Sequence, residues 1–167
     1  MYSPTGSLYF SRPLWRDEVN DMQRTASDLS ARIVAGSPDA ILYADRSGLI
    51  RLWNAAAERM FGYSPAEALG QSLDLIIPAG LRERHWDGWR RVLETGTSGY
   101  DSALLSVPAQ HKSGRRISCE FSIVMIKDEA GRLNGFASIM RDVTSRWERE
   151  KELKARLAAL EEQRNQL

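Results

Sequence analysis

The sequence contains a single cysteine, Cys119, among its 167 residues. One thiol cannot close an intramolecular disulfide or build a thiolate metal site. No apolar run is long enough to span a membrane, and the first residues lack the basic start and apolar core of a signal peptide. We therefore expect a protein of the reducing cytoplasm with no membrane partner.

The chain also lacks a marked excess of either charge. Its 23 basic and 22 acidic side chains leave a net charge of +1, so no global field attracts it to nucleic acid. Glycine-rich phosphate loops, paired metal ligands and nucleophile–base arrangements are not evident. We therefore expect a protein that is not an enzyme and binds no nucleic acid. Its length and its 43% hydrophobic residues correspond to about one globular domain with additional segments.

The N-terminal part divides into an irregular arm over residues 1–16 and an amphipathic helix over residues 17–36. The arm shows little periodicity, whereas the helix has apolar residues at steps of 3 and 4. These residues are Val19, Met22, Ala26, Leu29 and Ile33. The stripe predicts a helix that covers an apolar surface.

Residues 37–144 combine short strand patterns with helical ones. The sequence predicts a hairpin at 41–53, helices at 54–61 and about 80–94, and strands at 100–107, 116–126 and 134–142. Within 116–126, apolar and polar residues alternate, so one face of this strand is expected to point inward. The order predicts an α+β fold, with an antiparallel sheet whose helices lie between two groups of strands.

The C-terminal segment, 145–167, has a distinct composition. It carries 6 basic and 5 acidic residues, and its leucines recur at heptad spacing with Arg164 interrupting the seam. The leucines are Leu153, Leu157, Leu160 and Leu167. This pattern predicts a coiled-coil dimer seam or a signal-carrying linker, with a solvated helix that packs back on the domain as the alternative.

Several stretches resemble PAS sensor domains. They are DRSGLIRLWNAAAERMFGY at 45–63, EALGQS at 67–72 with LIIP at 75–78, and GFASIMRDVT at 135–144. The resemblance covers about residues 37–144. It implies a five-stranded antiparallel sheet with helices over one face, and a sensory or docking module.

One segment, at 77–91, resembles the helix that carries the proximal histidine in haem-binding PAS domains. Those domains occur in rhizobial oxygen-sensing histidine kinases and in direct oxygen-sensor phosphodiesterases. Their histidine follows a proline by seven residues, as His85 follows Pro78, and the rhizobial sensors have a propionate-binding arginine at the place of Arg91. The resemblance implies haem b with His85 as the iron ligand.

The remaining cofactor contacts are expected from apolar side chains. His85 shares its helical stripe with Trp89, and the alternating strand offers Phe121, Ile123 and Met125. Leu105 stands where the rhizobial sensors have an arginine that faces the bound gas, so the resemblance leaves the distal side of the haem apolar and its sixth ligand open.

Two classes of function follow from these features. In the first, the protein is a haem-based sensor of redox state or a diatomic gas that signals to the C-terminal helix. In the second, it is a haem-free PAS module for dimerisation or partner docking, or a sensor of another small molecule. Under either hypothesis we expect a homodimer through the flanking helices, and the chain could be the input part of a histidine kinase or another regulator.

Overall fold

The computed structural model describes residues 14–97 and 104–165. It divides the protein into two compact units, Met1–Gly36 and Ser37–Leu167. Each unit is therefore considered by itself.

The first unit contains the helix α1, Leu14–Gly36. It begins three residues before residue 17, where the sequence pattern places its start, and the rest of the expected arm, 1–13, lies outside the described residues. Large apolar side chains of its stripe are exposed at Met22, Leu29 and Ile33.

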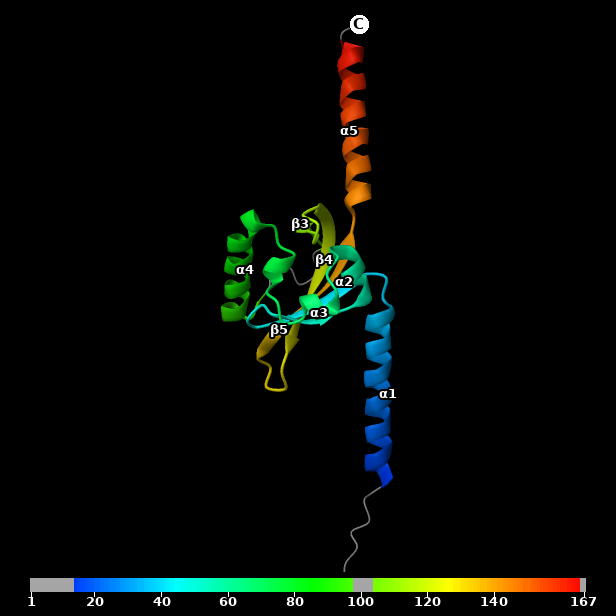
Figure 1. Ribbon diagram of the computed structural model, residues 1–167, viewed down its shortest axis with the longest axis vertical. Coiled ribbons are helices and arrows are strands. Elements are labelled where there is room, and N and C mark those ends of the chain that lie inside the picture. The colour runs from blue at the N-terminus through cyan, green and yellow to red at the C-terminus, as the bar shows by residue number, and fades with distance from the viewer. Residues whose placement is uncertain (1–13, 98–103, 166–167) are drawn as a thin grey trace, which may run out of the picture. The chain divides into compact units, whose positions relative to one another are not determined.

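The second unit is built on a five-stranded antiparallel sheet with the strand order β2-β1-β5-β4-β3 (Figure 1). Its strands are β1 (Ala40–Asp45), β2 (Ile50–Trp53), β3 (Leu105–Gln110), β4 (Arg116–Lys127) and β5 (Leu133–Asp142). The sheet and its helices confirm the α+β class and the expected five strands.

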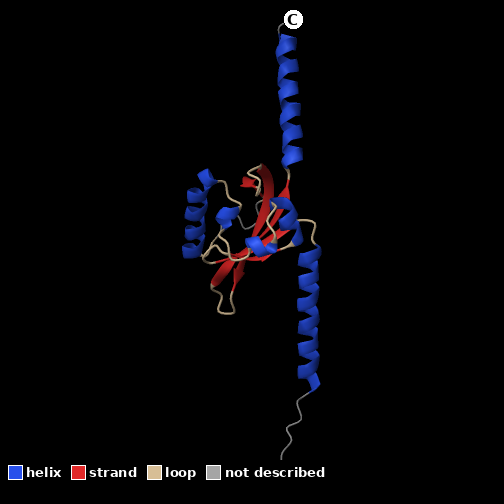
Figure 2. Cartoon of the chain, in the orientation of Figure 1, coloured by secondary structure: helices blue, strands red, loops and turns tan. Residues whose placement is uncertain are grey.

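Between β2 and β3 the described residues form helices joined by turns, as the sequence pattern predicts (Figure 2). These elements are α2 (Ala55–Phe61), α3 (Pro65–Ala68), the 3-10 turns η1 (Leu73–Leu75) and η2 (Ala79–Leu81), and α4 (Arg82–Thr95). The final helix, α5 (Thr144–Asn165), follows β5.

The strand expected at 100–107 differs from the one observed. Residues 98–103 lie outside the described part, and β3 continues through Pro108 to Gln110. A proline indicates a break in a central strand because it lacks the amide hydrogen for the ladder. It is accommodated here because β3 is an edge strand.

A buried asparagine joins α2 to the sheet. The Asn54 side chain accepts hydrogen bonds from the amide of Ala57 at 2.9 Å and from that of Ile41 at 3.0 Å. Its amide nitrogen donates to the carbonyl oxygen of Asp39 at 3.0 Å. One side chain therefore caps the helix and positions it against the first strand.

The pairing of β4 with β5 determines which side chains share the inner face of the sheet. Phe121 lies opposite Met140, Ile123 opposite Ser138, and Met125 opposite Phe136. The alternation predicted for 116–126 is therefore continued on the neighbouring strand. Three apolar side chains of the opposite face are exposed, namely Val124, Ile126 and Ile139.

The junction between β5 and α5 is hydrogen-bonded to β4. The amide of Val143 donates to the carbonyl oxygen of Ser118 at 2.8 Å, and the amide of Ser118 donates to Thr144 Oγ1 at 2.9 Å. Arg146 then pairs with Glu120 on the same strand. The start of α5 is thus tied to a strand that lies beside β5.

Beyond this junction, α5 is exposed along its length. The large side chains Trp147, Leu153, Leu157 and Leu160 are 51–60% exposed. These three leucines therefore do not pack back on the domain, and Leu167, the last leucine of the expected seam, lies outside the described residues. None of the helices in the described ranges is long and apolar enough to cross a membrane.

Candidate functional site

A cavity of about 500 Å³ lies between α4 and the inner face of the sheet. This volume falls within the range of roughly 300–1,000 Å³ that is typical of small-molecule and cofactor sites. The helix contributes His85 and Trp89 to its wall, and the strands contribute Leu42, Phe121 and Met140. The wall is predominantly apolar, so the cavity suits a ligand with a large apolar surface.

Polar contacts at the N-terminal end of α4 hold this helix in place. The Arg82 guanidinium donates to the carbonyl oxygens of Ile77 at 3.1 Å and Asp74 at 2.8 Å. The Trp86 indole nitrogen donates to the carboxylate of Asp74 at 2.9 Å. Because Asp74 lies in η1, these bonds connect the helix to the segment that precedes it.

A second tryptophan connects the middle of α4 to the sheet. The indole nitrogen of Trp89 donates to the carbonyl oxygen of Arg46 at 3.1 Å. Its ring lies 4.4 Å, centroid to centroid, from the ring of Phe136 on β5. The helical wall of the cavity is thereby positioned on both the β1–β2 turn and the central sheet.

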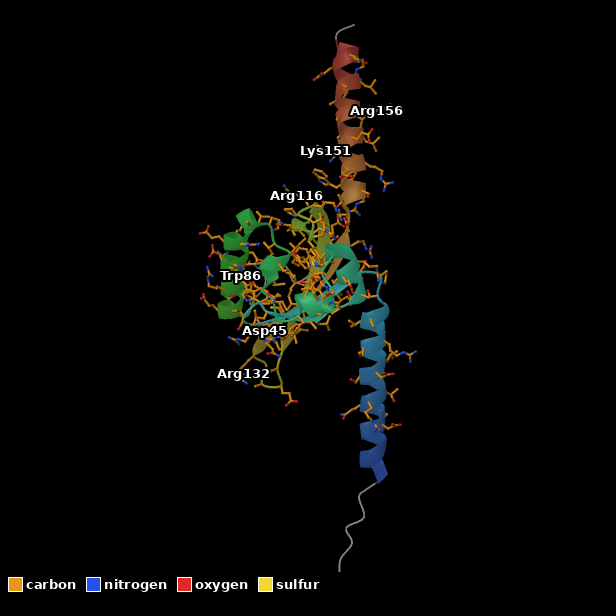
Figure 3. The ribbon with its side chains drawn as sticks, in the orientation of Figure 1. Asp45, Trp86, Arg116, Arg132, Lys151 and Arg156 are labelled. Carbon is orange, nitrogen blue, oxygen red and sulfur yellow. The ribbon has the colours of Figure 1, made fainter. Side chains whose placement is uncertain are left out.

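Close packing of Trp86, labelled on α4 in Figure 3, requires a glycine in the β1–β2 turn. Gly48 has a φ of +76°, and a Cβ atom there would overlap the Trp86 ring. The turn and the helix can therefore approach each other only because this side chain is absent.

Gly48→Ala is expected to reduce the free energy of unfolding by about 2–4 kcal/mol, since it adds a ring clash to left-handed backbone strain. The matched control is Gly70→Ala, because Gly70 has a φ of +81° and an added Cβ atom there would have no other atom within 4 Å. The control should lose only about 1 kcal/mol, from the left-handed backbone strain alone. Urea unfolding of both variants measures the difference, and equal losses would contradict a role for the Trp86 contact.

His85 is half-buried among aromatic rings in the cavity wall. Its ring meets that of Trp86 edge to face at 4.7 Å and lies 5.7 Å from that of Trp89. The Nδ1 atom is buried and has no hydrogen-bond partner among the described residues. Burial lowers the pKa of His85 below 6.5, against an opposing effect of the Asp74 carboxylate. The imidazole is therefore neutral at physiological pH and keeps a lone pair for a ligand.

The structure brings five of the seven residues selected from the sequence into one wall. These are His85, Trp89, Leu105, Phe121 and Ile123. Arg91 and Met125 do not line the cavity.

The two residues that lie outside the wall have different positions. Arg91 is exposed on α4, and the helix places it on a side that Arg84 also occupies, two turns earlier. Met125 shares the inner face of the sheet, but its neighbour Phe136 packs against Trp89 and forms the wall there.

The sequence reasoning missed wall residues on α4 and β5. Arg84 precedes His85, and Phe136, Ser138 and Met140 alternate along β5. Alternate residues of a strand lie on one face, so this spacing could have predicted the three β5 residues, as it predicted those of β4. Ser138 adds a hydroxyl to the apolar wall, and this hydroxyl makes no hydrogen bond to any described residue.

The comparisons with known proteins agree with this architecture. The model of the PAS fold family matches residues 34–148. The chain therefore belongs to the PAS family.

Within the described residues, no group of three or more histidine, cysteine, aspartate or glutamate side chains is placed to hold a metal ion.

Curated relatives include two sensor proteins. The chain is 38% identical over 68 residues to sensor protein FixL of Bradyrhizobium diazoefficiens. This aligned stretch makes up 41% of this chain and 14% of FixL. The chain is 28% identical over 80 residues to oxygen sensor protein DosP of Escherichia coli, covering 48% of this chain and 10% of DosP. An uncharacterized protein of Azorhizobium caulinodans is 32% identical over 111 residues, or 66% of this chain and 15% of that protein. The chain thus spans at most 15% of these relatives.

Solved structures show the same fold. The PAS domain of a Colwellia psychrerythraea protein is 26% identical and superposes with a TM-score of 0.63, covering 72% of this chain and 98% of that one. An RNA-binding light-oxygen-voltage receptor, 21% identical, has a TM-score of 0.66 and covers 95% of this chain and 41% of the receptor. At 21% identity, the similarity to this receptor shows a shared fold alone.

Proposed function

We propose that this PAS domain is a sensor that binds haem b through His85 and responds to redox state or to a diatomic gas. When bound, haem supplies an iron centre that changes redox state and binds small gases. The residues present suit this group, because they combine a neutral imidazole with an apolar wall.

The observation that carries the proposal is the state of His85. A buried polar atom without a partner costs free energy, and native proteins rarely retain one unless it serves a ligand or a reaction. The Nδ1 atom of His85 has no hydrogen-bond partner among the described residues, and the His85 ring lines a cavity of cofactor size. A metal centre in the cavity would use the imidazole, and the surrounding apolar side chains would exclude water from it.

The signal is proposed to leave the cavity along β5. Ser138 and Met140 line the cavity, and the strand ends at Asp142, two residues before α5 begins. The Val143 amide donates to Ser118, and the Ser118 amide donates to the Thr144 hydroxyl, so this junction is held to β4. A shift of either strand on ligand binding would therefore move the first turns of α5.

The experiment is a titration of the haem-free protein with haemin, followed by hydrogen exchange of both forms. Haemin should produce a Soret band and change amide exchange by about threefold or more in residues 145–156, where the helix leaves the domain. The exposed end of α5, at 157–164, serves as the internal control. Colourless protein would exclude haem, and a Soret band without any exchange change at 145–156 would contradict the relay.

A second function, homodimerisation, is favoured by the exposed apolar stripes. Leu153, Leu157 and Leu160 on α5 are exposed at heptad spacing, and the stripe on α1 is exposed as well. Such stripes are normally covered by a partner helix. We propose that the flanking helices pair two copies of the chain and connect the sensor to a downstream signalling domain or protein.

A further inference from the structure

Within the described residues, Arg84 is the only arginine, lysine, aspartate or glutamate in the wall of the cavity. Its guanidinium makes no hydrogen bond or ion pair to any described residue. Two other arginines of α4 are engaged, since Arg82 donates to the carbonyl oxygen of Asp74 and Arg90 pairs with Asp87. A cation with free donors thus stands next to His85 at the edge of an apolar cavity.

The resemblance to haem-binding PAS domains assigns the cation for the propionates to Arg91 instead. Arg84 and Arg91 are seven residues apart, so they lie on nearly the same side of α4, about 10 Å apart along its axis. The cavity reaches Arg84 and Gly88 on this side but does not reach Arg91. Both arginines are exposed, and they differ in their access to the cavity.

We propose that Arg84, and not Arg91, binds the carboxylate of the cavity ligand and makes the cavity selective for apolar molecules that carry one. This inference rests on the proposed sensor function, and for haem the carboxylate is a propionate. A guanidinium offers a planar pair of donors that matches both oxygens of a carboxylate. The apolar body of the ligand would occupy the wall formed by Trp89 and Phe121.

The test measures the dissociation constants of haemin and of haemin dimethyl ester for the wild type, Arg84→Ala and Arg91→Ala. Arg84→Ala should bind haemin about fivefold more weakly, with no change for the ester, because an exposed ion pair contributes about that factor. Added salt should weaken haemin binding in the wild type and not in Arg84→Ala. Arg91→Ala is the matched control and should behave as the wild type.

Two results would overturn the assignment. One is a loss of haemin affinity in Arg91→Ala with none in Arg84→Ala, and the other is an equal loss for haemin and its ester in Arg84→Ala. Circular dichroism of both variants checks that the fold is retained.

A second pair of probes separates this inference from the haem proposal. Dodecanoate and dodecanol share an apolar chain, and their binding is followed by tryptophan fluorescence, to which Trp89 in the wall contributes. If haemin does not bind but the wild type prefers dodecanoate and Arg84→Ala does not, the haem proposal fails and the role of Arg84 stands. If the preference is absent from the wild type or persists in Arg84→Ala, the role of Arg84 fails.

Discussion

His85→Ala is expected to weaken haemin binding at least about 100-fold and to remove the Soret band of the reconstituted protein. The substitution deletes the imidazole that the cavity offers, and loss of a metal ligand is at least as costly as the roughly 10–100-fold loss caused by its supporting groups. Absorbance titration of the haem-free protein gives the affinities.

The matched control for this variant is the other histidine of the chain. His111→Ala removes a ring that contacts Ser113 in the β3–β4 turn and does not line the cavity. It should leave the Soret band unchanged. Free imidazole should restore the band to His85→Ala by entering the space of the deleted side chain. An unaltered band in His85→Ala would contradict the proposed ligand.

His85 also determines how stability and haemin affinity are expected to depend on pH. Burial lowers the pKa of His85 below its ordinary value of 6.5, so the unfolded chain binds the proton more readily than the folded one. Its contribution to stability is therefore complete above about pH 6.5 and is lost as the pH falls through the lower, folded-state pKa. Haemin affinity should follow the same direction, because a proton competes for the lone pair.

Leu157→Lys combined with Leu160→Lys is expected to convert the proposed dimer into a folded monomer, with association weakened at least about 100-fold. Each leucine is about 60% exposed in the single chain, so burial in a dimer seam would be lost and four charges would be introduced per dimer. Sedimentation equilibrium measures the association constant, and circular dichroism reports the fold.

The control introduces the same charges on the same helix outside the seam. Ala158→Lys with Ala159→Lys keeps the net charge of the first variant and the helical propensity of α5. This control should associate as the wild type does. If the leucine variant also keeps its association constant, the α5 stripe is not the contact between copies.

Much of the fold could be predicted because its signals are local. The alternation in 116–126 reports that one face of β4 is buried, and the steps of three and four along α4 place His85 and Trp89 on one stripe. The capping box at Ser64 and Glu67 likewise marks the start of α3, and the glutamate accepts a hydrogen bond from the Ser64 amide at 3.0 Å. Each signal depends only on residues within a few positions of one another.

The composition of the cavity wall could not be predicted to the same extent. Periodicity identifies a face of a strand but does not say which residue of a neighbouring strand lies beside it. The β4–β5 register sets Phe136 beside Met125, and Trp89 then packs on Phe136. Trp89 and Phe136 are far apart in the sequence, so no local spacing pattern predicts their contact.

By itself, the sequence determined the class of the protein, the order of its strands and helices, the inward stripe that carries His85, and the heptad spacing of the leucines in α5. These properties follow from local spacing and from motifs that resemble one family. The tertiary structure alone decided that Arg84 and not Arg91 enters the cavity wall, that β5 supplies Ser138 and Met140, and that Pro108 lies in an edge strand. The physical reason is that these outcomes depend on where α4 and the strands pack. That packing is set by the contact of Trp86 with Gly48 and Asp74, which lie 38 and 12 residues earlier in the chain.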